Sequence, residues 1–296
     1  MELRVLRYFL VVAREENITK AAKILHITQP TLSRQLMQLE DELGIKLFKR
    51  SRHNITLSED GLLLRRRAQE IVTLADKTID GFLNKQEEIA GEISIGTGEF
   101  LSMDYFCQVM SSFHERYPLV RYGIRSDNTE GIEEKIDKGL LDFGVLTETI
   151  DISKYDYIHF PQKEQWGILC RKDSSLAKKR VIELSDLDNQ TLILPRRADK
   201  NLNITNWFEN RLNSFEIIGS YNLLYNAAMM VKNGMGIALC MRLNACYENL
   251  CFIPLFPALD ANVILIWKKN QALPLATATF IEYFKKYNLG ISYDEI

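Results

Sequence analysis

Several polar side chains fall on a predicted helix near the amino terminus, away from its apolar face. Within residues 29–43, leucines recur at spacings of four, three and four, which predicts one buried stripe. That stripe consists of Leu32, Leu36, Leu39 and Leu43. The polar residues off it are Thr31, Arg34, Gln35 and Gln38. Arginine forks onto guanine, glutamine onto adenine, and threonine reaches bases or phosphates, so the pattern is typical of a helix that reads DNA.

A basic segment follows this helix after Gly44. Residues 45–57 contain two apolar-flanked stretches around a polar tip, which predicts a small hairpin, or wing. The tip carries Lys49, Arg50, Arg52 and His53. Because these side chains are basic and polar, we expect them to face the phosphate backbone of DNA.

The elements that must position these residues come earlier in the chain. Apolar residues from Leu3 to Ala13 recur at helical spacing, and Asn17 can cap a second, short helix over residues 18–25. Thr28 is a good N-cap for the third helix, and Pro30 lies in its first turn. A three-helix bundle with a solvated charged face is the plainer interpretation. The order of short helix, capped turn, exposed polar face and basic wing favours DNA binding.

Charge is distributed unevenly along the chain of 296 residues. Residues 1–67 hold 13 Lys and Arg against 8 Asp and Glu, whereas the remainder holds 24 against 31. A basic head on an acidic body indicates that only the head meets a polyanion. With 46% apolar residues, no apolar run near membrane-spanning length and no signal peptide pattern, we expect a cytoplasmic protein without a membrane partner.

The sequence offers little for catalysis or metal binding. Five scattered cysteines argue for a reducing compartment, and the close pair Cys246 and Cys251 is interpreted as core residues, not as a zinc site. Leu101 stands where a dinucleotide fingerprint after Gly98 would need glycine. The nearby Glu99 suits the first turn of a helix better than an acid/base role. We therefore predict no catalytic residue, no metal and no cofactor.

A long amphipathic helix is predicted over the connector, residues 59–90. Its apolar residues step by three and four, which gives a narrow seam that a lone helix cannot bury. The seam residues are Leu64, Ala68, Ile71, Ala75, Ile79 and Phe82. The seam packs either against the same chain or against a second copy, and we favour a dimer.

The body, residues 91–296, alternates short apolar runs with helical patterns. This order predicts an α/β fold in which a mainly parallel sheet is covered on both faces. Ligands in such sheets bind beyond the carboxyl ends of strands. The loops in those places are residues 96–102, 126–129 and 195–197. Arg196 and Arg197 either pair a ligand carboxylate or are solvated surface.

The stretch from Phe9 to Gly61 closely resembles the DNA-binding head of LysR-type transcriptional regulators. The matching segments include residues 9–13, 18–22, 25–36, 39–44, 47–50 and 57–61. The resemblance implies a winged helix-turn-helix in residues 1–58 and a sequence-specific transcriptional regulator, not an enzyme. It implies that DNA is contacted by Thr28, Gln29, Pro30, Thr31, Ser33, Arg34 and Gln38, with Arg50 and Arg52 in the wing.

The weaker resemblance of the body implies a two-lobed effector-binding domain built like periplasmic solute-binding proteins. Lobe I would comprise residues 91–161 and 268–296, and lobe II residues 162–267. Thr129 aligns with a ligand-contacting threonine of the family, while Thr97 and Ser102 straddle a second expected position that Phe100 occupies. The effector would be a small, anionic molecule in the cleft between the lobes. The predicted contacts are Thr97, Gly98, Phe100, Ser102, Thr129, Pro195 and Arg196.

The resemblance also implies the partners: an inverted-repeat operator in double-stranded DNA, a second copy in a homodimer or homotetramer, and RNA polymerase. Two alternatives come from other classes. A DNA-tethered enzyme would convert its ligand during long incubation. An architectural DNA binder without a ligand would show no saturable shift in melting temperature with any metabolite.

Overall fold

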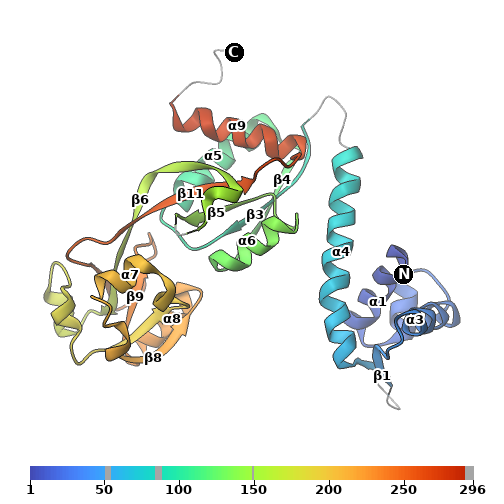
Figure 1. The fold of residues 1–296 in the computed structure, drawn as a ribbon, viewed down its shortest axis with the longest axis horizontal. Coiled ribbons are helices and arrows are strands. Elements are labelled where there is room, and N and C mark those ends of the chain that lie inside the picture. Colours follow the sequence, from blue (N-terminus) through green and yellow to red (C-terminus); the bar gives the residue numbers. More distant parts are fainter. Residues whose placement is uncertain (51–54, 84–88, 149, 291–296) are drawn as a thin grey trace. The chain divides into compact units, whose positions relative to one another are not determined.

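The computed structural model describes residues 1–50, 55–83, 89–148 and 150–290, and the chain divides into two compact units (Figure 1). The first unit spans Met1–Gln86 and the second Glu87–Ile296. Arg52 lies outside the described residues. Among the described residues, no helix is both long enough and apolar enough to cross a membrane.

The first unit is a helical head with a two-stranded wing. Its elements are α1 (Leu3–Glu15), α2 (Ile18–Ile24), α3 (Gln29–Leu43), β1 (Phe48–Arg50), β2 (Ile55–Leu57) and α4 (Glu59–Leu83). Asn17 caps α2 by accepting a hydrogen bond from the Lys20 N–H at 2.9 Å. Thr28 stands at the N-cap of α3 but makes no capping bond to the backbone. Helix α3 ends at Gly44, whose φ of +68° is one that glycine adopts without strain.

The core of the head lies between α1, α3 and the wing. Three of the four predicted stripe leucines of α3, at 32, 36 and 39, are at most 3% exposed and pack around Phe9. Leu43 is 37% exposed, so its prediction as a core residue is wrong. It is the last residue of α3, and the chain turns away after it instead of covering it. The buried place next to Leu39 is taken by Glu40, which is only 6% exposed.

Helix α4 uses two different faces. Ala68 and Val72 are buried against the head, in the same core as α1, and Arg7 of α1 forms an ion pair with Asp76. Ile71 and Ile79 of the predicted seam are exposed instead, at 41% and 49%. Ile71 lies at the edge of the side that packs on the head, whereas Ile79 points in the same direction as Ala68 and Val72 but lies further along α4.

The second unit holds one continuous sheet in the order β4-β3-β5-β11-β6-β9-β7-β8, with β10 also paired to β6. The strands are β3 (Gly91–Thr97), β4 (Val120–Ser126), β5 (Phe143–Thr147), β6 (Tyr155–Arg171), β7 (Thr191–Pro195), β8 (Glu216–Tyr221), β9 (Ile237–Met241), β10 (Leu250–Pro254) and β11 (Asp260–Lys268). The helices are α5 (Met103–Arg116), α6 (Thr129–Asp137), α7 (Leu202–Trp207), α8 (Leu224–Lys232) and α9 (Leu275–Asn288).

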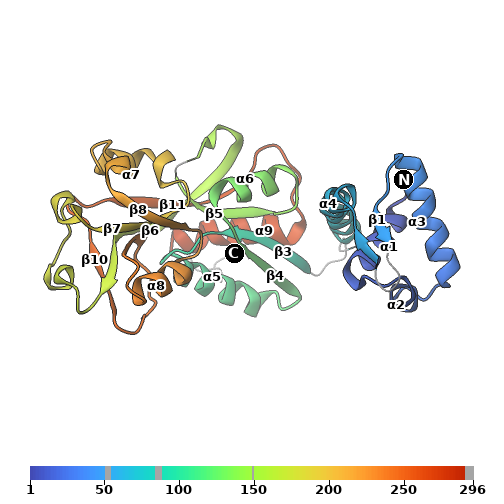
Figure 2. The ribbon, with the colours of Figure 1, turned by 90° about the horizontal axis from the view of Figure 1, so that it is seen from below.

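Two lobes result because the long strands β6 and β11 run from one half of this sheet to the other (Figure 1). In lobe I, α5 and α9 cover one face and α6 the other; in lobe II, α7 and α8 lie on opposite faces (Figure 2). Val263, Leu265 and Trp267 pack in the core of lobe I, although the sequence analysis assigned them to lobe II. The reason is that β11 pairs with β5, so the chain re-enters lobe I along that strand.

Candidate nucleic-acid interface and ligand cleft

The amino-terminal part of α3 presents an exposed polar surface. Among the predicted DNA contacts, Ser33 is half-buried. The exposed ones are Thr28, Gln29, Pro30, Thr31, Arg34 and Gln38. The Thr28 and Thr31 hydroxyls are 2.8 Å apart, and the Gln29 amide donates to the Ser33 hydroxyl at 2.9 Å. These bonds pre-order part of the surface, and leave the Arg34 guanidinium without a polar partner among the described residues.

The wing is tied to α3 through the buried carboxylate of Glu40. This carboxylate accepts hydrogen bonds from the backbone N–H of Leu47 at 2.8 Å and of Phe48 at 3.3 Å, and from the Lys46 ammonium at 3.0 Å. Burial by itself raises the pKa of Glu40, but these three bonds outweigh it and the pKa is lowered. The charged carboxylate therefore fixes where β1 starts relative to α3.

The wing carries an exposed basic side chain on β1. Lys49 is exposed on β1, opposite Thr56 on β2. The backbone of Arg50 closes the same strand and pairs with Ile55. Gly61 lets α4 approach this hairpin, since a Cβ there would meet the Leu47 carbonyl oxygen at 2.1 Å. The first turn of α4 is thereby packed on the wing that carries Lys49.

A cleft of about 510 Å³ lies between the two lobes of the second unit. Five of the predicted effector contacts line it: Gly98, Phe100, Thr129, Pro195 and Arg196. Two predicted contacts do not. The Thr97 hydroxyl is buried and donates to the Gly98 carbonyl at 2.9 Å, and the fully buried Ser102 hydroxyl donates to Glu164 at 2.6 Å.

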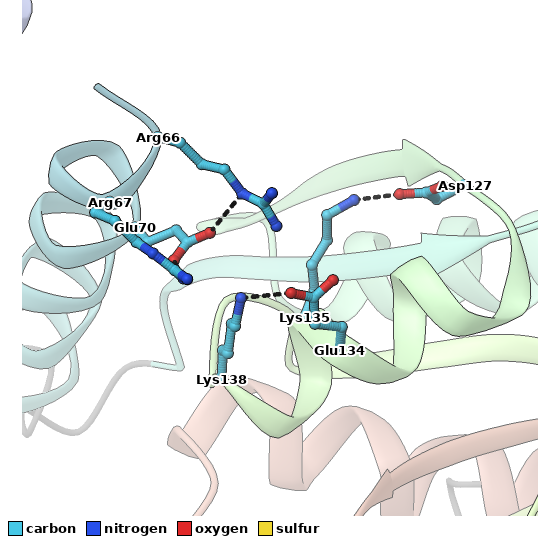
Figure 3. Close-up of polar contacts among 7 residues, drawn as sticks. All are labelled: Arg66, Arg67, Glu70, Asp127, Glu134, Lys135 and Lys138. Atoms are coloured by element: carbon cyan, nitrogen blue, oxygen red, sulfur yellow. Dashed lines mark hydrogen bonds and ion pairs between the residues drawn. The ribbon is translucent and has the colours of Figure 1, made fainter. Parts of the chain in front are cut away.

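Charged side chains face each other across this cleft. On lobe I, Asp127 pairs with Lys135 of α6 (Figure 3). Burial acts to raise the pKa of Asp127, but the bonds from the Lys135 ammonium and the Asn128 N–H outweigh it, so the carboxyl pKa is lowered. The positive charge of Arg196 in lobe II also favours the ionised form of Asp127. Asp127 therefore stays ionised at neutral pH and holds Lys135, which leaves Arg196 and Lys200 as exposed cations on the opposite wall.

Two polar contacts join the lobes at the cleft. Arg197 of lobe II forms an ion pair with Glu130 of α6. Glu99 of lobe I accepts a hydrogen bond from the Leu224 N–H, at the first turn of α8. A carboxylate is favoured there because helix N-termini carry unpaired N–H groups and a positive dipole. Both contacts favour a closed arrangement of the lobes.

Residues that sequence reasoning missed come mostly from the crossing strands and from lobe II. Glu164 of β6 is fully buried and accepts from the Leu101 and Ser102 N–H groups, at 2.9 and 2.8 Å, which fixes the start of α5. Trp166 and Tyr221 line the cleft. The missed signal was an acidic residue inside a strand, which is seldom buried without such donors. Tyr221 ends β8, so the rule that ligands bind at strand ends would have found it.

Two family descriptions match the chain. The family described as "Bacterial regulatory helix-turn-helix protein, lysR family" matches residues 3–62. The family described as "LysR substrate binding domain" matches residues 86–288. The first match covers α1 to α3 and the wing, and the second covers the two-lobed sheet with its cleft.

Relatives and solved structures agree with these matches. The HTH-type transcriptional regulator BsdA of Bacillus subtilis is 36% identical over 199 residues, 66% of this chain and 67% of that protein. The uncharacterized HTH-type transcriptional regulator YbhD of Escherichia coli is 26% identical over 295 residues, 94% of this chain and 89% of its own. The full-length CbnR crystal structure with its target DNA has a TM-score of 0.75 at 20% identity, over 97% of this chain and 99% of that one. At that identity the likeness shows the fold.

Proposed function

Because this chain belongs to the LysR family of transcriptional regulators, with the family's helix-turn-helix and substrate-binding domain, we propose that it reads an operator through α3 and answers to a small effector in the interlobe cleft. One observation carries the DNA-binding half: the exposed polar face at the amino-terminal end of α3. The relatives are transcriptional regulators and the family's members are not enzymes, which removes a DNA-tethered enzyme from consideration.

We assign base contacts to Gln29, Thr31 and Arg34, and further contacts to Thr28, Pro30, Ser33 and Gln38. Lys49 and Arg50 of the wing, with Arg52 beyond the described residues, would hold phosphates. This division follows from the chemistry of the groups, since guanidinium and amide side chains at a helix start match base edges and wing cations match phosphates. The experiment is selection of bound duplexes from a random pool, which should return an inverted repeat. Recovery of unrelated sequences would argue for an architectural DNA binder.

The inverted repeat requires two heads, and we propose that α4 supplies the contact between two copies. Leu63, Ile71 and Leu74 are exposed at 64%, 41% and 45%. At about 100° per residue, Leu63 and Leu74 lie opposite the buried Val72, and Ile71 lies between them and the buried Ala68. A second α4 laid against this side would bury three large apolar side chains. Homotetramers would add a second interface through the body.

For the effector we propose a small anion held by Arg196 and Thr129. Arg196 is an exposed cation that lines the cleft, and Thr129 begins α6, whose first turn offers N–H groups to an anion. Screening metabolites by thermal shift identifies the ligand, and calorimetry then compares Thr129→Val with the wild type. Loss of the hydroxyl should weaken binding by about 1–3 kcal/mol if it bonds the ligand. Unchanged affinity would place the ligand elsewhere.

Regulation then links the two halves. A ligand that favours one arrangement of the lobes changes the shape of the assembled dimer or tetramer, and with it the spacing of the DNA heads. We propose that this change acts in the cytoplasm on promoters, through contacts with RNA polymerase. A footprint of the selected operator with and without ligand tests the link, and an identical footprint and DNA affinity in both states would refute it.

A further inference from the structure

Two cysteines face each other on neighbouring strands of lobe II. Cys170 of β6 is the direct register partner of Cys251 of β10 in an antiparallel pair. Their sulfur atoms are 3.7 Å apart, and both thiols are free. Register partners in antiparallel strands have Cα atoms about 4.5–5.5 Å apart, which lies within the range that a disulfide spans. Side-chain rotation is therefore enough to bring the sulfurs to bonding distance.

The two thiols differ in access to solvent. Cys170 is fully buried, and its burial, with the nearby Cys251 thiol, raises its pKa to about 12. It therefore remains protonated near neutral pH and makes a poor first nucleophile. Cys251 is only half-buried, and its side chain packs beside Cys170 at the edge of one core of lobe II. A small oxidant can thus reach the Cys251 thiol, whereas the Cys170 thiol is shielded from solvent.

We propose that Cys170 and Cys251 form a peroxide-oxidisable dithiol, a second input to this regulator besides the effector. In the first step the Cys251 thiolate attacks one oxygen of hydrogen peroxide, which gives a sulfenic acid at Cys251 and, after uptake of a proton, one water. In the second step the Cys170 sulfur attacks the Cys251 sulfur, and the displaced hydroxide takes up the Cys170 proton and leaves as a second water. The two thiols are oxidised and the peroxide is reduced.

The bond would act as a staple within lobe II. Cys170 and Cys251 are 81 residues apart in the chain, so the disulfide would close a loop that contains β7, β8 and β9. Cross-linking a loop of this length removes freedom from the unfolded chain. The same strand β6 continues to Trp166, which lines the effector cleft. Oxidation therefore stabilises the folded form of the lobe that carries Arg196.

The other cysteines supply controls. Cys246 is exposed, Cys240 is buried, and Cys107 is exposed on α5. Within the described residues, no group of three His, Cys, Asp or Glu side chains is arranged to hold a metal ion. Cys246 is nearer to Cys251 in sequence, so a bond between those two is the competing outcome.

The test treats the reduced full-length protein with hydrogen peroxide, blocks the remaining thiols and maps the peptides by mass spectrometry. We expect five alkylatable thiols to fall to three, a peptide that joins Cys170 to Cys251, reversal by dithiothreitol, and a higher melting temperature of the oxidised protein. Five remaining thiols, a Cys246–Cys251 link or a link between chains would each overturn the proposal. The wild-type peptide map decides this without any variant.

Variants resolve the order of the steps. Cys170→Ser should stop at the sulfenic acid, so that dimedone labels Cys251 after peroxide treatment. Cys251→Ser should prevent both the label and the link, whereas Cys246→Ser and Cys107→Ser should oxidise like the wild type. If replacement of the buried Cys170 impairs folding, Cys170→Ala serves in its place. Dimedone labelling at Cys246 in place of Cys251 would contradict the assigned first nucleophile.

Discussion

Arg34 has the features expected of a base-reading side chain. It is exposed on the polar face of α3 and has no polar partner among the described residues, so DNA would not have to break an existing bond. We predict that Arg34→Ala weakens binding to the selected operator by about 1–3 kcal/mol and blurs the preference among bases. Titration of the operator and of random duplexes by fluorescence anisotropy measures both effects.

Lys49→Ala is the matched control for Arg34→Ala, since it removes a cation from the wing instead of from α3. It should weaken all sequences alike and reduce the dependence of affinity on salt. Equal losses on operator and random DNA for Arg34→Ala would reassign Arg34 to phosphate binding.

Glu40 should make the stability of the head depend on pH. Its pKa is lowered in the folded chain, because hydrogen bonds outweigh the opposing effect of burial. The contribution of the Glu40 carboxylate to folding stability is therefore present above the ordinary glutamate pKa of 4.5. This contribution is lost as the pH falls through the lowered pKa of the folded chain. Glu40→Gln should destabilise the head by about 1–3 kcal/mol at pH 7, with a smaller difference near pH 3.

Hydrogen exchange of the head amides, corrected for intrinsic rates at each pH, measures the effect of Glu40→Gln in the full chain. Asp41→Asn is the control, since Asp41 is exposed on the same turn of α3 and should leave protection unchanged at both pH values. A Glu40→Gln effect of the same size at pH 7 and pH 3 would show that the charge is not what matters.

At the scale of elements, α4 illustrates how one helix serves two packing partners. Ala68 and Val72 pack in the same core as α1. Leu63, Ile71 and Leu74 stay exposed. Along the same helix Arg66 and Arg67 both pair with Glu70 (Figure 3). The exposed apolar side is therefore available to a second copy, while the head remains folded without it.

We predict that Ile71→Asp shifts the protein towards monomers that bind DNA weakly. The substitution would bury a carboxylate without a partner in the α4–α4 contact. Sedimentation velocity measures the shift. Leu62→Asp is the control, because Leu62 is also exposed, at 50%, but lies on a different side of the helix. Dimers that persist in Ile71→Asp would exclude this side of α4 as the main contact.

At the scale of the whole molecule, the two interlobe contacts set how readily the effector domain closes. Glu99 accepts from the Leu224 N–H, and Arg197 pairs with Glu130, so each contact spans the cleft. We predict that Glu99→Gln weakens effector binding about five- to tenfold, because a smaller fraction of molecules then has the closed cleft. Calorimetry with the effector found by screening measures the change.

Asp104→Asn is the control for Glu99→Gln. Asp104 also lies near the start of α5, where its carboxylate accepts from Gln108 and not from lobe II. It should bind the effector and the operator like the wild type, since it touches neither the interlobe contacts nor the head. Wild-type effector affinity in Glu99→Gln would show that this contact does not control closure.

The sequence by itself determined the elements of the head and the chemistry of its surface. The leucine spacing in α3 defines a buried stripe, and Gly44 and Asn17 mark helix ends, because helical periodicity and capping act within a few residues. The same local patterns predicted the alternation of strands and helices in the body. They failed at Leu43, where the end of the element decides burial.

Only the tertiary structure decided which distant groups meet. Glu99 and Leu224 are 125 residues apart, and Cys170 and Cys251 are 81 apart. Their contacts depend on strand order and register, which no local pattern encodes, since β6 must cross between lobes before β10 can pair with it. The buried carboxylates of Glu40 and Glu164 follow the same logic. A polar group is buried where the fold supplies its donors, and those donors come from other elements of the chain.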